Sequence, residues 1–258
     1  MRRFTLSSIV LATALVLPGA AQSQTPAPTG AAKWADSAAR LIDRASITGD
    51  VAGLQSARTL LDRALVAFPN DPLLLHYQGY ELYREANTLQ GMRRGAEAAP
   101  LIQKARTALE KSIAGKSIPE SHALLSSVLG EMIGTDPSLG MTLGPQSGQE
   151  MQAAIAAGPF NPRVWMLRGI SSLYTPAEYG GSVSNAESEL NKAVALFASE
   201  RPVSPEPSWG NAEAYAWLGQ VLQKENKTAD AVAAYNKALA LEPGYMWVKM
   251  VLLPSTKK

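Results

Sequence analysis

The residues able to do acid–base chemistry or bind a metal are few and scattered. The chain has no cysteine and two histidines, His76 and His122, which lie far apart in the sequence. Neither histidine has a carboxylate or a second histidine at metal-ligand spacing on its own expected helix. Histidines in such surroundings are more often hydrogen-bonded packing residues than bases or ligands. We therefore expect no catalytic residue, no metal site and no cofactor, and we predict that the protein is not an enzyme.

One short run is similar to a phosphate-binding loop but lacks the other parts of that motif. Gly115-Lys116-Ser117 matches its last residues, whereas Glu110 stands where its first glycine belongs. A strand also precedes the motif in nucleotide-binding proteins, and no strand pattern precedes this run. We therefore exclude nucleotide binding here.

Aromatic and charged side chains at helical spacing are a better candidate for binding. Tyr77, Tyr80 and Tyr83 follow one another on one expected helix, with His76 and Arg84 beside them. Rings supply contact area, and interleaved polar groups fix the register of an extended peptide. The alternative is that several of these tyrosines pack between helices, as aromatic stripes at this spacing often do.

The elements that carry these side chains are expected to be helices arranged in pairs. The clearest pair covers residues 212–222 and 229–241, where apolar residues recur every three or four positions around a short turn. Its signature residues are Tyr215, Leu218, Gly219, Leu222, Ala231, Tyr235, Ala238 and Pro243. The small Gly219 and Ala231 indicate a close helix crossing, and Pro243 stops the second helix. This spacing resembles the tetratricopeptide repeat, or TPR.

The same frame recurs along the chain. A first unit is expected at 38–71, and the starts Asp71-Pro72 and Asn161-Pro162 open a second and a fourth unit, because a capping side chain followed by proline begins a helix. The third unit is the least regular. We expect its helices at 119–133 and 150–157, with Gly130 at the small position and a loop over 134–148.

The fold expected from these units is all-α. It is a right-handed α-solenoid of about five TPR-like helix pairs plus a C-terminal capping helix at 245–253, over residues 34–253, with a tail at 254–258. The resemblance to TPR proteins implies that the first helix of each pair lines a concave groove. The side chains then expected in the groove are His76, Tyr80, Tyr83, Arg84, Glu131, Arg163, Met166, Tyr174, Gln220 and Lys224.

Short aromatic and glycine-containing runs and two long inserts between helices are further features of the sequence. The run Thr175-Pro-Ala-Glu-Tyr-Gly-Gly, the pair Trp209-Gly210 and the pair Trp247-Val248 resemble exported bacterial TPR proteins of unassigned function. The inserts at 134–148 and 175–184 are long enough to be functional. They offer a second hypothesis, in which they roof a pocket for a small ligand.

The N-terminus has the pattern of an export signal. Arg2 and Arg3 precede an uncharged apolar run, and small residues follow it, so we predict a cleaved signal peptide at 1–23 and a flexible linker at 24–33. The formal net charge of +2 comes from these two arginines, and the remaining chain is balanced. We expect no nucleic-acid partner, and contact with a membrane only during export.

Together these features predict a periplasmic or secreted scaffold that binds a protein or an extended peptide in its concave groove. The alternative is a small-ligand-binding component of a periplasmic uptake or envelope system. Self-association through the end helices, giving a homo-oligomer, is compatible with both.

Overall fold

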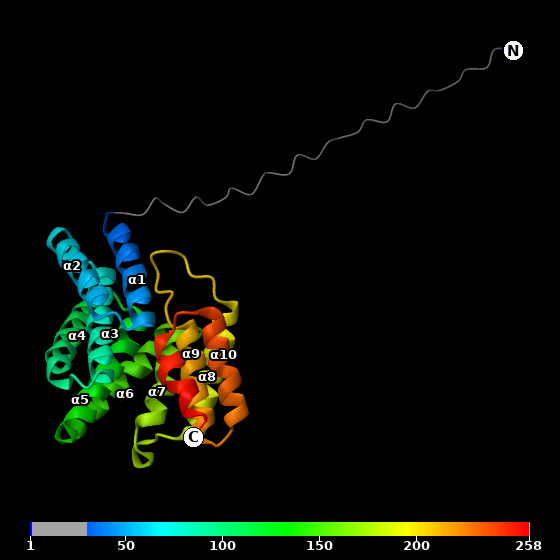
Figure 1. The fold of residues 1–258 in the computed structure, drawn as a ribbon. Helices are drawn as coiled ribbons and strands as arrows, with labels where there is room; N and C mark the ends of the chain where they lie inside the picture. Colours follow the sequence, from blue (N-terminus) through cyan, green and yellow to red (C-terminus); the bar gives the residue numbers. More distant parts are fainter. Residues whose placement is uncertain (2–29, 258) are drawn as a thin grey trace.

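The computed structural model describes Met1 and residues 30–257, which form five helix pairs and a short C-terminal helix (Figure 1). The pairs are α1 (Gly30–Thr48) with α2 (Val51–Ala67), α3 (Pro72–Gly91) with α4 (Gly95–Gly115), α5 (Pro119–Thr135) with α6 (Gly140–Ala157), α7 (Pro162–Tyr174) with α8 (Val183–Ser199), and α9 (Asn211–Lys224) with α10 (Thr228–Leu241). The described part of the chain contains no β-strand, and none of its helices combines the length and apolar character needed to span a bilayer. The predicted all-α solenoid of helix pairs is confirmed.

The two ends of the solenoid differ slightly from expectation. Apart from Met1, the predicted signal peptide at 1–23 and the linker up to residue 29 lie outside the described residues. The rest of the linker is helical, because α1 begins at Gly30, which packs against the ring of Phe68. At the other end, a π-helical turn (Val248–Leu252) leads into α11 (Leu253–Ser255). The π-helical turn packs on α9 and α10 as the predicted cap. The short helix α11 continues into the expected tail.

Two helices begin where the capping residues predicted them to begin. The carboxylate of Asp71 accepts hydrogen bonds from the backbone N–H groups of Leu73 and Leu74, at 3.1 and 3.0 Å, at the start of α3. The side-chain oxygen of Asn161 accepts one from the N–H of Arg163, at 3.0 Å, at the start of α7. These bonds satisfy N–H groups that have no partner within the helix.

Glycine allows the two helices of a pair to approach closely at equivalent positions. A Cβ atom added to Gly79, Gly169 or Gly219 would lie 2.5, 2.7 or 2.3 Å from a side chain of the second helix. Those side chains are Leu109, Leu190 and Tyr235 respectively. The predicted close crossing at Gly219 is confirmed, and the second and fourth pairs repeat it.

The third pair corrects two expectations. Gly130 is not at the crossing, because nothing lies within 4 Å of its added Cβ. Ser126 takes that place, buried and bonded to Ser147, with the two hydroxyl oxygens 3.0 Å apart. The expected loop at 134–148 is the end of α5, a 3₁₀ turn and the first half of α6, which contains Pro145. Burial of apolar side chains of α6 against α5 outweighs the low helix propensity of this stretch.

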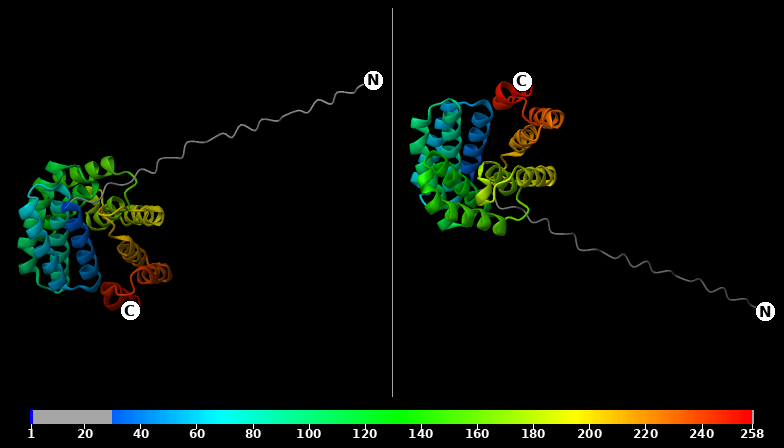
Figure 2. Two further views of the ribbon diagram at one scale, coloured as in Figure 1. Left: turned by 90° about the horizontal axis from the view of Figure 1, so that it is seen from above. Right: turned by 90° about the horizontal axis from the view of Figure 1, so that it is seen from below.

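The concave side of the solenoid lies on the first helices of the pairs. Consecutive first helices contact one another, from α1 through α3, α5 and α7 to α9, whereas no two consecutive second helices pack together comparably. In a curved array of helix pairs, the helices that lie closer to one another are those on the inner, concave surface. Both views in Figure 2 show the pairs curving so that α1 lies near the C-terminal helix.

A matched pair of helix glycines tests the close crossing. We expect Gly219→Ala to destabilise the protein by about 1–3 kcal/mol, because the new methyl group overlaps the fully buried ring of Tyr235. Gly130→Ala, at an open and exposed helix position, should stabilise it by about 0.5–1 kcal/mol through helix propensity. Urea denaturation measures both values, and equal effects of the two substitutions would contradict the crossing.

Candidate functional site

Residues 200–210, here called the crossing segment, link α8 to α9 and pass over the inner helices of the solenoid. In Figure 1 this link is the gold coil that loops beside α1. Its first residue, Glu200, accepts two hydrogen bonds from the guanidinium of Arg163 on α7, at 2.6 and 2.9 Å. Arg163 is only 1% exposed, so this ion pair fixes the start of the segment inside the protein.

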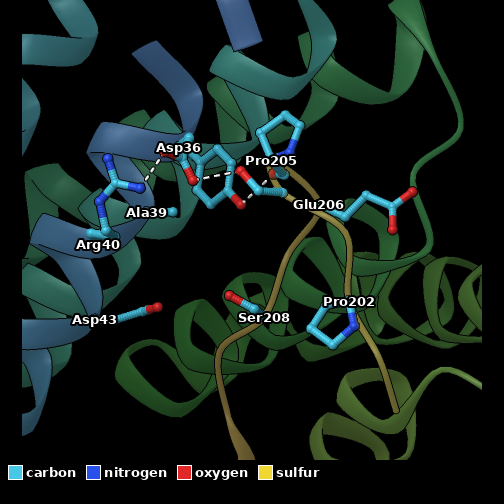
Figure 3. A pocket seen from close by; sticks show the side chains of 10 residues that line it. Asp36, Ala39, Arg40, Asp43, Pro202, Pro205, Glu206 and Ser208 are labelled. Carbon is cyan, nitrogen blue, oxygen red and sulfur yellow. Dashed lines mark hydrogen bonds and ion pairs between the residues drawn. The ribbon is translucent and has the colours of Figure 1, made fainter. Parts of the chain in front are cut away.

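Two hydrogen bonds attach the middle of the crossing segment to α1 and α3 (Figure 3). The hydroxyl of Ser204 donates to Asp36 at 2.6 Å, and the hydroxyl of Tyr77 donates to the backbone carbonyl of Pro205 at 2.9 Å. The second bond engages the main chain rather than a side chain. Grooves that bind extended peptides use the same kind of contact.

An aromatic anchor holds the end of the crossing segment. Trp209 is 5% exposed and stacks on Tyr80 of α3, with ring centroids 4.5 Å apart and ring planes 17° apart. The guanidinium carbon of Arg163 lies 5.7 Å from the centroid of the same indole. Gly210 follows with a φ of 102°, a conformation that favours glycine, and turns the chain into α9.

An ion pair joins the second helix pair to the fifth across the groove. Nη1 of Arg84 on α3 donates to Oε1 of Glu213 on α9 at 2.7 Å, and both side chains are largely buried. The guanidinium of Arg84 also lies 5.7 Å from the centroid of the Tyr80 ring. The groove is therefore spanned by the crossing segment and by this ion pair.

The predicted groove residues fall into three groups. His76, Tyr80, Tyr83, Arg163 and Met166 are buried; Arg84, Glu131 and Gln220 are partly buried; Tyr174 and Lys224 are exposed. The chain's own crossing segment lies against some of these side chains, because Trp209 stacks on Tyr80 and Glu200 pairs with Arg163. Their role in binding a partner stays a prediction. Sequence reasoning flagged Trp209 but missed that it would fill the groove.

His76 is a neutral packing residue in a buried hydrogen-bond chain. Its Nδ1 lies 2.9 Å from the hydroxyl of Ser121, which lies 2.9 Å from that of Ser112, and Ser112 donates to the carbonyl of Pro72 at 2.8 Å. The proton on Ser112 is used by Pro72, so an unbroken chain requires Ser121 to donate to Ser112 and His76 to donate from Nδ1. Burial lowers the pKa of His76 to about 3.

His122, on α5, connects the link between α4 and α5 to α6. Its Nε2 lies 2.9 Å from the hydroxyl of Ser117, and its Nδ1 lies 2.6 Å from a carboxylate oxygen of Glu150 on α6. Serine, histidine and carboxylate are in the order used by hydrolases. The imidazole is nearly buried and ties the α4–α5 link to α6, so we assign the trio a structural role. Because Glu150 lies on a different helix, no spacing in the sequence pointed to this contact.

Several buried polar atoms facing the interior have no hydrogen-bond partner among the described residues. They come from different inner helices and from the crossing segment: Oδ1 of Asp43, Oε2 of Glu131, Nε of Arg163, Nε1 of Trp209 and Nε2 of Gln220. Native proteins leave few such atoms, because each costs about 1–3 kcal/mol.

Comparisons with known proteins agree with this fold. Residues 212–245 match the model of the tetratricopeptide repeat, so the chain carries a TPR. A TPR protein of Thermus thermophilus is similar in structure, with 20% identity, a TM-score of 0.59, and coverage of 87% of this chain and 100% of that chain. The HusA haemophore from Porphyromonas gingivalis is 24% identical, with a TM-score of 0.56 and coverage of 78% and 96% respectively. No curated protein matches the sequence.

Glu131 gives the inner surface a pH-dependent group. Burial raises the pKa of its carboxyl to about 7, although hydrogen bonds from Asn87 and Tyr83 and the charge of Arg84 act in the opposite direction. Between the ordinary pKa of a glutamate and about 7, the folded protein binds more protons at this residue than the unfolded chain does. The free energy of unfolding therefore falls as the pH rises through this window.

Glu131→Gln tests that assignment. The variant should match the wild type near pH 4.5 and become more stable than it by up to about 3 kcal/mol at pH 8, because glutamine cannot ionise. Urea denaturation at pH 4.5, 6 and 8 measures the difference. Glu178→Gln, at an exposed position, is the control and should show no such trend. A difference that stays constant across this range would refute the shift.

Proposed function

We propose that this TPR protein is an interaction scaffold whose concave groove binds an extended peptide of a partner in place of its own crossing segment. A solenoid of helix pairs offers a continuous concave surface of the kind used for binding. The groove here joins aromatic rings with charged and amide side chains, which suits a peptide that presents both carbonyl groups and rings.

The observation that carries this proposal is the way the groove already holds its own chain. Tyr77 donates to a main-chain carbonyl of the crossing segment, and Tyr80 stacks on the indole of Trp209. A hydrogen bond to the main chain together with an aromatic anchor is a general mode of peptide recognition. The segment is therefore a stand-in that indicates the chemistry of the partner: an extended, proline-containing peptide that ends in an aromatic residue.

Release of the crossing segment does not require the helix pairs to separate. Residues 201–204 are exposed, and the middle of the segment is held by two side-chain hydrogen bonds. Such bonds contribute about 1 kcal/mol each. Glu200 keeps its ion pair with Arg163 at the start of the segment, and beyond it Trp209 is the main anchor, so a partner with a competing aromatic residue has one principal contact to replace there.

The alternative of small-ligand binding does not rest on the insert at 134–148, contrary to what the sequence suggested. The stretch 134–148 is largely helical and forms no roof. A cavity beside Asp43, walled in part by the crossing segment, supports this alternative instead.

A peptide with the sequence of residues 200–210 tests the groove. Labelled and added to the mature protein, it should bind Trp209→Ala at least tenfold more tightly than wild type, because the tethered segment competes at an effective concentration of roughly millimolar. Adding Tyr80→Ala to this variant should remove the gain. Fluorescence anisotropy measures binding, and circular dichroism confirms that each variant is folded.

Trp165→Ala is the matched control, since Trp165 bonds to the carbonyl of Pro159 outside the crossing segment. It should leave peptide binding at the wild-type level. If Trp209→Ala fails to fold, Ser204→Ala replaces it, with a smaller gain expected, because it loosens the tethered segment and leaves the groove side chains unchanged. Folded variants that bind the peptide no better than wild type would rule out displacement.

We also propose that the protein acts in the periplasm or outside the cell, on the strength of the basic, apolar and small-residue pattern at its N-terminus. Expressed with residues 1–29 in a Gram-negative host, it should appear in the periplasmic fraction. Its N-terminus, read by mass spectrometry, should follow Ala21 or Ser23. An intact Met1 on protein that stays in the cytoplasm would refute export.

A further inference from the structure

A cavity of about 270 Å³ lies between α1 and the crossing segment (Figure 3). Its polar lining comes from Asp36, Arg40 and Asp43 on α1, Tyr77 on α3, and the crossing segment. Ala39, Pro202 and Pro205 add apolar wall. The volume lies just below the range of pockets for drug-sized molecules, so an occupant must be small.

The charges in this cavity are unevenly paired. Arg40 and Asp36 form an ion pair, and Asp36 also accepts the bond from Ser204, so both are satisfied. Asp43 has no ion-pair or hydrogen-bond partner among the described residues, and its Oδ1 is buried. In Figure 3 its carboxylate points toward the crossing segment across the cavity. The unmet requirement is therefore a donor, and a positive one.

Burial and the nearby charged groups determine whether the Asp43 carboxyl is ionised. Burial raises the pKa of Asp43 to about 6, whereas the charges of Arg84 on α3 and Arg163 on α7 lower it. The carboxylates of Glu213 on α9 and Glu242 after α10 raise it further. The group is thus mostly ionised near neutral pH while lacking a bonded partner, which is costly for a buried charge.

We propose that this cavity binds a small primary alkylamine, whose ammonium group donates hydrogen bonds to Asp43 and whose methylene chain lies against Ala39 and the prolines. An ammonium group supplies both the charge and the donors that the carboxylate lacks. A metal ion fits less well, because the described residues contain no cluster of three or more histidines and carboxylates able to hold one. This site goes beyond the proposed peptide groove, because it uses the crossing segment as its wall.

The same chemistry can come from a free amine or from a lysine side chain of a partner. The volume of about 270 Å³ favours the free amine, which brings no backbone with it. Comparing n-butylamine with Nα-acetyl-lysine N-methylamide separates these sources. Tighter binding of the lysine derivative would transfer the site to a protein partner and overturn the proposal of a free amine.

Calorimetric titration of the mature protein with n-butylamine at pH 7.5 tests the site. Wild type should bind n-butylamine at least tenfold more tightly than n-butanol, which has the same chain without the charge. Asp43→Asn should lose this preference, since it keeps the shape of the side chain but not the charge. Asp230→Asn, at an exposed position on α10, is the control and should bind as wild type does.

Two results would overturn the proposal. The first is wild-type protein that binds the amine no better than the alcohol, a comparison that needs no variant to fold. The second is folded Asp43→Asn that keeps the full preference for the amine. Neither depends on peptide binding, because the crossing segment stays in place throughout, so failure here leaves the groove proposal untouched.

Discussion

The ion pair between Arg163 and Glu200 is the constraint on which the inner face of the protein depends. A guanidinium that is 1% exposed must be paired, because removing one partner of a buried ion pair costs about 3–5 kcal/mol. Glu200 is the first residue after α8, so pairing it with α7 turns the chain inward at that point. The residues that follow are then directed over α1 and α3, and Trp209 reaches Tyr80.

This inward turn changes what kind of solenoid the protein is. In an ordinary repeat array each unit contacts only its neighbours, and stability is close to a sum over units. Here the crossing segment connects the fourth and fifth pairs to the first two, and the ion pair of Arg84 with Glu213 does the same. Contacts between units far apart in the sequence couple the ends, so loss of one end pair removes contacts from the opposite end as well.

The sequence predicted those parts of the fold that rest on local chemistry. Capping by Asp71 and the close approach at Gly219 depend on residues within one helix pair, and both were visible as spacing. Pro145 misled the prediction because burial against α5 outweighs propensity, and burial is not local. The expected groove residues all lie on first helices of the pairs. Packing of the tyrosines between helices was considered as the alternative, but the stacking of Trp209 on Tyr80 was not predictable, because no repeat pattern encodes where Trp209 lies.

The crossing segment gives the two proposed sites a common element with opposite demands. A peptide in the groove requires the segment to leave, whereas an amine beside Asp43 requires it to remain as a wall of the cavity. A ligand shifts a conformational equilibrium only by the difference between its affinities for the two states. The amine favours the closed state and the peptide the open one, so each must weaken the binding of the other by the same factor. Beyond the ion pair of Glu200, the segment is held by one aromatic anchor and two side-chain hydrogen bonds, which is weak enough attachment for that coupling to operate.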